Sequence, residues 1–174
     1  MIPCANPAAQ FQSHQNEIEE AVLRVLRGNR YILGEEVEAL EREFADFIGT
    51  KAAVGVANGT DAIELSLRAL DIGPGDEVIT VSHTAVATVA AIEAAGATPV
   101  LVDVDPAYYT LQANQLQEVL TPQTKAVVVV HLYGHAADMD AIGEFCKTNN
   151  VELIEDVSQA HGARWNGRRL GSIG

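Results

Sequence analysis

Five short apolar runs, separated by segments of helical periodicity, follow one another from Ala52 to Asp156. The runs expected to form strands are AAVGVA, EVITVS, TPVLVDV, KAVVVVH and VELIED. The segments expected to form helices are TDAIELSLRAL, TAVATVAAIEAAG, QLQEVL and MDAIGEFCKTNN. Strands that are apolar along almost their whole length are typical of a parallel sheet with helices on both faces. The pattern therefore predicts an α/β fold with a three-layer, doubly wound, mostly parallel sheet.

The first 50 residues follow a different, purely helical pattern. Two segments, HQNEIEEAVLRVLRG and EEVEALEREFADFIG, each place apolar residues on one helical face. These residues are Ile18, Val22, Val25 and Leu26 in the first segment and Val37, Leu40, Phe44 and Phe47 in the second. We therefore expect an N-terminal helical segment at 1–50 and an α/β domain at 51–174. Within that domain, GARWNGRRLG carries an Asn-Gly pair that predicts a β-hairpin.

The chain is strongly acidic, because 24 Asp and Glu against 11 Lys and Arg give a formal net charge of −13. Such a charge repels nucleic acids and anionic membrane surfaces, so we expect neither as a partner. The opening residues lack the pattern of a signal peptide, and no apolar stretch approaches the length of a membrane span. Cys4 and Cys146 fit neither a disulfide framework nor a metal knuckle. These features predict a cytoplasmic protein.

Ligands of doubly wound sheets bind beyond the carboxyl ends of the strands. The predicted strands bring five loops to this edge, at 58–61, 82–85, 103–105, 131–135 and 156–159. In the first loop, Gly59 lets a ligand approach the backbone, and the free N–H groups of the following helical turn suit a phosphate. Thr60 adds a hydroxyl group. On this stretch alone, an ordinary helix cap formed by Thr60 and Asp61 is the simpler explanation of the same residues.

Asp156 ends the last predicted strand on the loop side, and alternation points Glu155 to the opposite face. A carboxylate carried toward the interior needs a positive partner. Gln159 follows on the same loop and can donate or accept a hydrogen bond. A helix cap or a structural salt bridge is the alternative explanation for Asp156. His83, in the loop after EVITVS, either covers a planar cofactor or is incidental to a helix-capping turn.

Two further polar clusters do not favour a ligand. The sequence HLYGHAADMD suggests a metal site, with candidate ligands His131, His135, Asp138 and Asp140. Gly134 interrupts this run after a strand, so the two imidazoles need not converge, and we predict no metal. Asp103 and Asp105 are expected to cap a loop rather than bind ribose, because no glycine fingerprint accompanies them.

The order of these segments resembles one known family over nearly the whole chain. The stretches that carry the resemblance are RYILGEEVEALEREF, GVANGTDAIELSLRAL, IGPGDEVITVSHTAVAT, GATPVLVDVDP, VVVVHLYGHAADMDAI and IEDVSQAHGARWNGRRLGSIG. They look like the DegT/DnrJ/EryC1/StrS family of sugar aminotransferases, which use pyridoxal 5′-phosphate (PLP) and have the fold-type-I aminotransferase architecture. The resemblance implies that 51–174 is part of the PLP-binding large domain. It also implies transfer of an amino group from glutamate or glutamine to a nucleotide-linked keto sugar.

The resemblance assigns roles to the loop residues. Asp156, in the IED motif, would pair with the protonated pyridine nitrogen of PLP. Gln159 would hydrogen-bond the phenolic oxygen of the ring. Gly59 and Thr60 would hold the phosphate at the start of a helix, in agreement with their own chemistry.

The sequence departs from the family pattern in two ways. Many members carry an aromatic residue directly after the HT motif, where it stacks on the PLP ring, whereas Ala85 stands here. His83 is the expected substitute. The Schiff-base lysine of the family is expected downstream of Gly174, so we expect no catalytic residue within this chain. We therefore expect an incomplete large domain that is inactive by itself, with the small domain also absent.

The resemblance also bears on partners and alternatives. Family members usually form homodimers, so we expect a homodimer, and Tyr31 is expected near the nucleotide-sugar substrate. Some relatives carry histidine in place of the lysine and dehydrate a deoxysugar. Others were first described as regulatory proteins, so a non-catalytic binding fragment is a further alternative.

Overall fold

The computed structural model describes residues 5–174, so Cys4 lies outside the described residues. The chain begins with three helices, α1 (Pro7–Ser13), α2 (Gln15–Arg27) and α3 (Glu35–Ile48). The strands of the main sheet are β1 (Glu77–Val81), β2 (Thr98–Val102), β3 (Thr124–Val130) and β4 (Glu152–Asp156). The helices around it are α4 (Gly59–Ala69), α5 (Val86–Ala95), α6 (Ala113–Val119) and α7 (Met139–Asn149), with a short 3₁₀ turn, η1 (Leu132–Gly134). The predicted hairpin is confirmed as β5 (Arg164–Trp165) and β6 (Arg168–Arg169).

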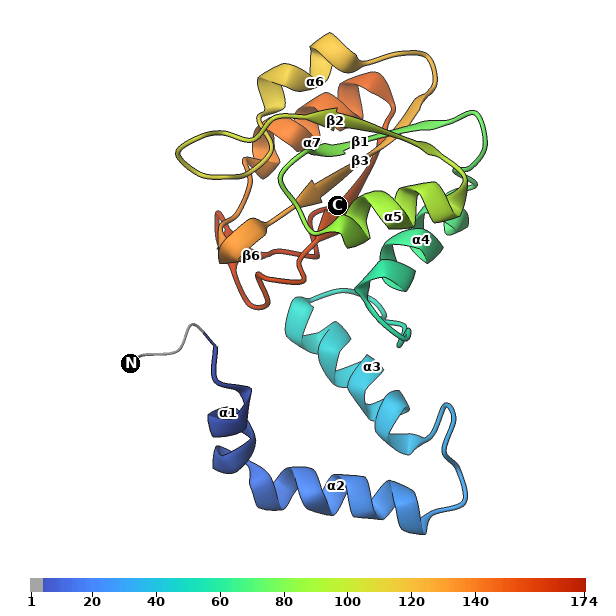
Figure 1. Ribbon diagram of the computed structural model, residues 1–174, viewed down its shortest axis with the longest axis vertical. Coiled ribbons are helices and arrows are strands. Elements are labelled where there is room, and N and C mark those ends of the chain that lie inside the picture. Colours follow the sequence, from blue (N-terminus) through green and yellow to red (C-terminus); the bar gives the residue numbers. More distant parts are fainter. Residues whose placement is uncertain (1–4) are drawn as a thin grey trace.

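The four main strands are all parallel and lie in the order β2-β1-β3-β4. The chain moves outward from β1 to β2, and then continues with β3 and β4 on the other side of β1 (Figure 1). The carboxyl ends of β1 and β3 therefore flank a topological switch point, which is where sheets of this kind bind ligands. The predicted α/β fold with a parallel sheet is confirmed.

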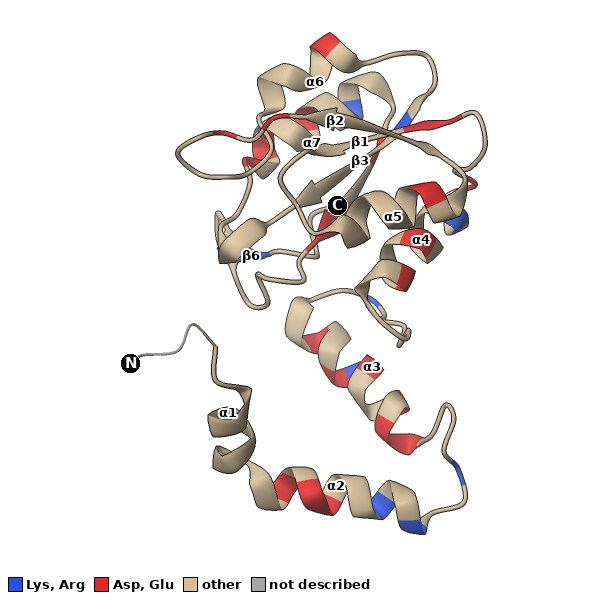
Figure 2. Ribbon diagram, viewed as in Figure 1, with Lys and Arg blue, Asp and Glu red and all other residues tan. Residues whose placement is uncertain are grey.

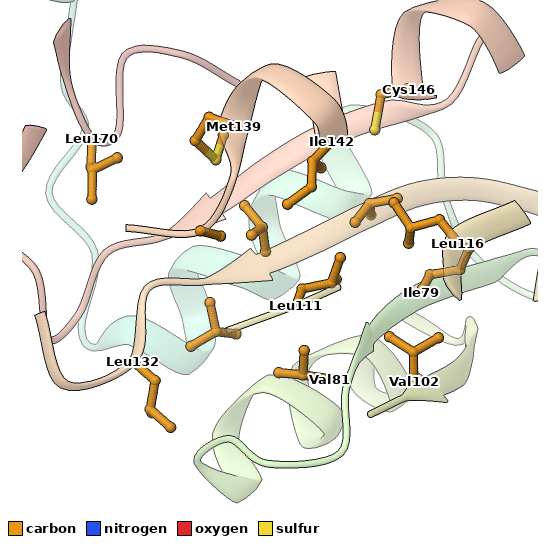
Figure 3. Packing of buried hydrophobic residues seen from close by; sticks show 14 of the residues in the cluster. Ile79, Val81, Val102, Leu111, Leu116, Leu132, Met139, Ile142, Cys146 and Leu170 are labelled. Carbon is orange, nitrogen blue, oxygen red and sulfur yellow. The ribbon is translucent and has the colours of Figure 1, made fainter. Parts of the chain in front are cut away.

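Apolar side chains cover both faces of this sheet. On one face, Ile79 of β1 and Val127 of β3 pack in a core with α6 and α7 (Figure 3). On the other face, Val78 and Val128 of the same strands pack with Leu67 of α4 and with α5. Successive residues of a strand point to opposite faces, so a strand buried on both sides needs apolar residues at nearly every position.

The N-terminal helices extend away from the sheet (Figure 1). In α2 the charges match the helix dipole, with Glu17 in the first turn and Arg24 and Arg27 in the last (Figure 2). The predicted apolar stripe is present, but the described residues leave it largely open: Leu26 is 61% exposed and Leu40 57%. Among the described helices, none has both the length and the apolar character that crossing a membrane requires.

The run AAVGVA at 52–57 was predicted to be a strand, and this prediction is wrong. The segment is irregular, and Val54 is 79% exposed. The N–H of Gly55 donates to Oε1 of Glu41 in α3 at 2.7 Å. A strand forms only where a neighbour completes its hydrogen-bond ladder, and within residues 5–174 no strand pairs with this segment.

Cys146 of α7 provides a test of the packed core. Its thiol is buried, and burial, followed by the negative charge of Glu152, raises its pKa to about 12. Since the thiolate is the reactive form, we expect this cysteine to resist alkylation at pH 8 while the protein is folded. Peptide-level mass spectrometry after iodoacetamide treatment should find Cys146 labelled only when denaturant is present. Rapid labelling under native conditions would contradict the packing of α7.

Candidate functional site

A pocket of about 180 Å³ opens at the switch point of the sheet. Four parts of the chain form it: the start of α4, the loop between β1 and α5, the end of β3 together with Leu132 of η1, and the loop after β4. Four of the residues predicted to bind the cofactor line it, namely Gly59, Thr60, Asp156 and Gln159. The structure thus brings the predicted phosphate loop and the predicted carboxylate into one cavity.

The start of α4 presents unused backbone donors. Asn58 is the N-cap, because its Oδ1 accepts the N–H of Asp61 at 2.9 Å and its carbonyl accepts the N–H of Ala62 at 3.1 Å. Thr60 and Asp61 therefore lie in the first turn, and the alternative that they cap the helix is wrong. Among the described residues, the N–H groups of Gly59 and Thr60 have no hydrogen-bond partner. Two free donors at the positive end of a helix can hold an anion.

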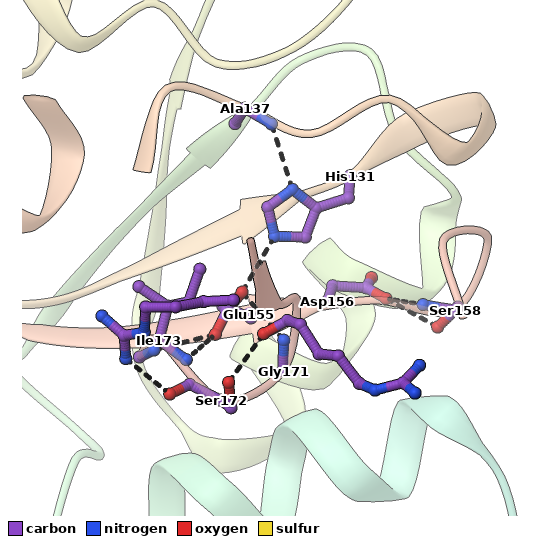
Figure 4. Close-up of polar contacts among 11 residues, drawn as sticks. His131, Ala137, Glu155, Asp156, Ser158, Gly171, Ser172 and Ile173 are labelled. Atoms are coloured by element: carbon purple, nitrogen blue, oxygen red, sulfur yellow. Dashed lines mark hydrogen bonds and ion pairs between the residues drawn. The ribbon is translucent and has the colours of Figure 1, made fainter. Parts of the chain in front are cut away.

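Hydroxyl groups orient the half-buried carboxylate of Asp156 (Figure 4). Its Oδ1 accepts the N–H of Ser158 at 3.1 Å and the hydroxyl of Ser158 at 2.6 Å, and its Oδ2 accepts the hydroxyl of Thr88 in α5 at 3.4 Å. Within the described part of the chain, no basic nitrogen lies within 4.0 Å of this carboxylate. A partly buried carboxylate without a cationic partner in this segment suits the cationic group of a ligand.

Gln159 is fixed at the pocket by a backbone contact from η1. Its Oε1 accepts the N–H of Tyr133 at 2.8 Å. Because the oxygen takes this bond, the side-chain NH₂ group is left to donate elsewhere. Tyr133 holds this position with a left-handed backbone, at a φ of 57°. Non-glycine residues rarely adopt that conformation, and it recurs at functional sites.

The two remaining predicted site residues lie outside this pocket. His83 is exposed, and its Nε2 lies 3.1 Å from the Tyr133 hydroxyl; Thr84 and Ala85, which follow it, do line the cavity. Tyr31 lies between α2 and α3 and donates from its hydroxyl to the carbonyl of Leu26 at 3.2 Å. That connection is remote from the sheet edge in Figure 1.

A buried histidine–glutamate hydrogen bond that the sequence did not reveal lies next to Asp156. His131, at the end of β3, and Glu155 are both almost fully buried, and Nε2 of His131 lies 3.2 Å from Oε2 of Glu155 (Figure 4). Nδ1 of His131 accepts the N–H of Ala137 at 3.1 Å. Since Nδ1 is an acceptor, the imidazole proton is on Nε2 and is donated to Glu155. Alternation had indicated the face of Glu155, but nothing in the local sequence identified its donors.

Hydrogen bonding outweighs desolvation at Glu155. Burial alone disfavours the charged form and would raise its pKa. The bonds from His131 and from the backbone N–H groups of Gly171, Gly174 and Ile173 act in the other direction, and the pKa is lowered. The carboxylate is therefore ionised at neutral pH.

The remaining polar residues make separate contacts. His135 stacks on Tyr108, with ring centroids 5.3 Å apart, and so does not converge with His131. Asp105 accepts the N–H groups of Ala107 and Tyr108, which confirms that it caps a loop. The bond from Ala107, followed by that from the Gln112 side chain and that from Tyr108, lowers the pKa of Asp105.

Known proteins resemble this chain in both sequence and fold. The sequence model of the DegT/DnrJ/EryC1/StrS aminotransferase family matches residues 12–174. The chain is 49% identical to the dTDP-3-amino-3,6-dideoxy-alpha-D-galactopyranose transaminase of Aneurinibacillus thermoaerophilus, covering 100% of this chain and 48% of that protein. It is 46% identical to the UDP-2-acetamido-2-deoxy-3-oxo-D-glucuronate aminotransferase of Pseudomonas aeruginosa, covering 89% of this chain and 43% of that protein.

Among solved structures, the fold is similar to that of S. venezuelae DesV, crystallised in complex with a ketimine intermediate. The TM-score is 0.95 at 46% sequence identity, over 98% of this chain and 46% of that one. The chain thus spans about half the length of the relatives that it matches. The matched range and these identities show that the chain belongs to the DegT/DnrJ/EryC1/StrS aminotransferase family.

Proposed function

We propose that the full-length protein is a PLP-dependent aminotransferase. It transfers an amino group from glutamate or glutamine to the keto carbon of a nucleotide-linked sugar. In this proposal, residues 51–174 form part of the PLP-binding large domain and residues 1–50 form the N-terminal helical segment. Support comes from the named activities of relatives at 46–49% identity, one acting on a dTDP-linked and one on a UDP-linked sugar.

One observation carries the proposal: two kinds of group that PLP requires line a single pocket. The free N–H groups of Gly59 and Thr60 suit its phosphate, and the Asp156 carboxylate suits its protonated nitrogen. The residues present therefore fit the cofactor. An anion site and a carboxylate without a basic neighbour are otherwise difficult to explain in one small cavity.

When bound, PLP supplies an electron sink for the carbanion that forms when the amino donor loses its Cα proton. Asp156 keeps the ring nitrogen protonated, because a nearby carboxylate favours the charged form of that nitrogen. The NH₂ group of Gln159 donates to the phenolic oxygen. In this proposal His83 would cover the ring from the loop that also carries Thr84 and Ala85. Tyr31 is remote from this pocket in its own chain and would contact the sugar bound to a second copy. The lysine is supplied from beyond Gly174.

We also propose a homodimer located in the cytoplasm. The open apolar stripe on α2 and α3 is the kind of surface that a second copy covers, with Leu26 and Leu40 both more than half exposed. The free thiol of Cys146 is consistent with a reducing compartment.

The test uses the full-length protein, PLP and glutamate or glutamine labelled with ¹⁵N at the amino group that is transferred. dTDP- and UDP-linked keto sugars serve as acceptors. We expect mass spectrometry to find ¹⁵N in the sugar together with one equivalent of the 2-oxo acid. Removing PLP should abolish the transfer, and adding it back should restore it. Loss of water from a deoxysugar without consumption of the donor would instead identify a dehydratase, and no transfer from either donor would contradict the proposal.

A further inference from the structure

The buried carboxylate of Glu155 and the residues that follow β6 form a hydrogen-bonded cluster that the proposed chemistry does not use. We call Gly171–Gly174 the GSIG turn. Oε1 of Glu155 accepts the N–H groups of Ile173 at 2.7 Å and Gly174 at 2.8 Å. Oε2 accepts the N–H of Gly171 at 2.9 Å and the Nε2–H of His131 at 3.2 Å. Each oxygen receives two donors, so the carboxylate is saturated in its charged form.

Both glycines of the GSIG turn are required by its path. Gly171 has a φ of +85°, in the left-handed region that favours glycine. At Gly174 the backbone passes so close to β4 that an added Cβ would lie 2.8 Å from the carbonyl oxygen of Leu153. This close approach to β4 accompanies the three N–H groups that the turn directs at one carboxylate.

We propose that Glu155 is a positioning residue, whose charged carboxylate holds the GSIG turn against β4 and sets the direction in which the chain leaves Gly174. Asp156 is the next residue of β4 and points to the other face of the strand. At the end of β4, the carboxylate of Asp156 thus faces the ligand pocket, while that of Glu155 holds the GSIG turn. The catalytic consequence rests on the proposed function, since the family resemblance implies that the reactive lysine follows this turn.

The charge of Glu155 is essential to this role. Glutamine has nearly the same shape, but its one oxygen can accept only two of the four donors. Its NH₂ group would face donors, so the N–H groups nearest to it would lose their bonds. A hydrogen bond to a charged group contributes enough free energy that its loss lowers the protection of the amide against hydrogen exchange by about 10-fold or more.

The first measurement is amide hydrogen exchange in the full-length protein, with Glu155→Gln as the variant and Glu152→Gln as the matched control. Glu152 lies on the same strand but is exposed. We expect exchange to become about 10-fold faster or more in Glu155→Gln at those of Gly171, Ile173 and Gly174 that lose their acceptor. It should stay unchanged in Glu152→Gln. Unchanged exchange in Glu155→Gln overturns the proposal, whatever the activity of the protein.

The second measurement is steady-state kinetics of the same variants. If the turn positions a reacting group, Glu155→Gln should lower kcat by about 10- to 100-fold, while the KM for the amino donor changes less. Faster exchange with an unchanged kcat would overturn the positioning role. Absence of transamination in the unsubstituted protein would contradict only the proposed function, because the exchange result stands independently.

A third measurement needs no substitution and applies if Glu155→Gln fails to fold. The ¹³C signal of the Glu155 carboxyl carbon reports its ionisation in the unmodified protein. The titratable and charged groups nearby are His131, which directly follows β3, Asp156 of β4, and Arg168 and Arg169 of β6. We expect a titration midpoint below that of an ordinary glutamate; a midpoint above it would overturn the proposal.

Discussion

Replacing Asp156 by asparagine in the full-length protein is expected to lower the transamination rate by roughly 30-fold to several thousand-fold. Asparagine keeps the shape of the side chain but removes the negative charge that faces the ring nitrogen in the proposed complex. Removing one partner of a hydrogen-bonded charge pair costs about 2–5 kcal/mol, and each 1.4 kcal/mol corresponds to about tenfold in rate. The measurement is kcat with saturating PLP and donor, together with the Kd for PLP.

The fold should survive this substitution. Oδ1 of an asparagine can still accept from the N–H and hydroxyl of Ser158, which provide the two shorter contacts of the present carboxylate. The matched control is Asp103→Asn, which makes the same change at the same edge of the sheet but outside the pocket. Asp103 is exposed and accepts the hydroxyl of Ser82 at 3.1 Å. Activity of Asp156→Asn within about threefold of the control would rule out the role assigned to Asp156.

The convergence of the pocket residues could be predicted because it follows from a property of parallel sheets. Once the apolar runs indicate parallel strands, the loops after their carboxyl ends must lie at one edge. Asp156, at the end of β4, and Thr84, after β1, follow this rule. Gly59 was predicted at the same edge from a strand at 52–57 that does not form, and the packing of α4 on the sheet places it there instead. The structure places Gly59 and Asp156 in one cavity.

What could not be predicted depends on partners that the local sequence does not specify. The run at 52–57 has the composition of a strand, but strand formation needs a neighbour, and the described residues supply none. Helix α1 was not predicted, because seven residues are too few to establish a helical period. Glu155 was assigned a face by alternation, but its four donors come from the residue that follows β3 and from a turn 16 to 19 residues later.

Helix α4 connects the stability of the fold to the site, because its first turn carries Gly59 and Thr60 while its buried face anchors it. Leu67 is fully buried in the core that α4 shares with Val78 and Val128. We expect Leu67→Ala to lower the free energy of unfolding by about 2–5 kcal/mol, through lost apolar burial and the cavity left behind. Denaturant unfolding followed by circular dichroism measures this change.

Leu65, two residues earlier on the same helix, is 50% exposed and provides the matched control. Leu65→Ala makes the identical chemical change, and alanine is a helix former at least as good as leucine, so we expect a change of no more than about 0.5 kcal/mol. The difference between the two variants isolates the packing of α4 on the sheet from its helix propensity. Equal effects would mean that α4 is not held by this core, and the geometry of the phosphate-binding turn would then need another anchor.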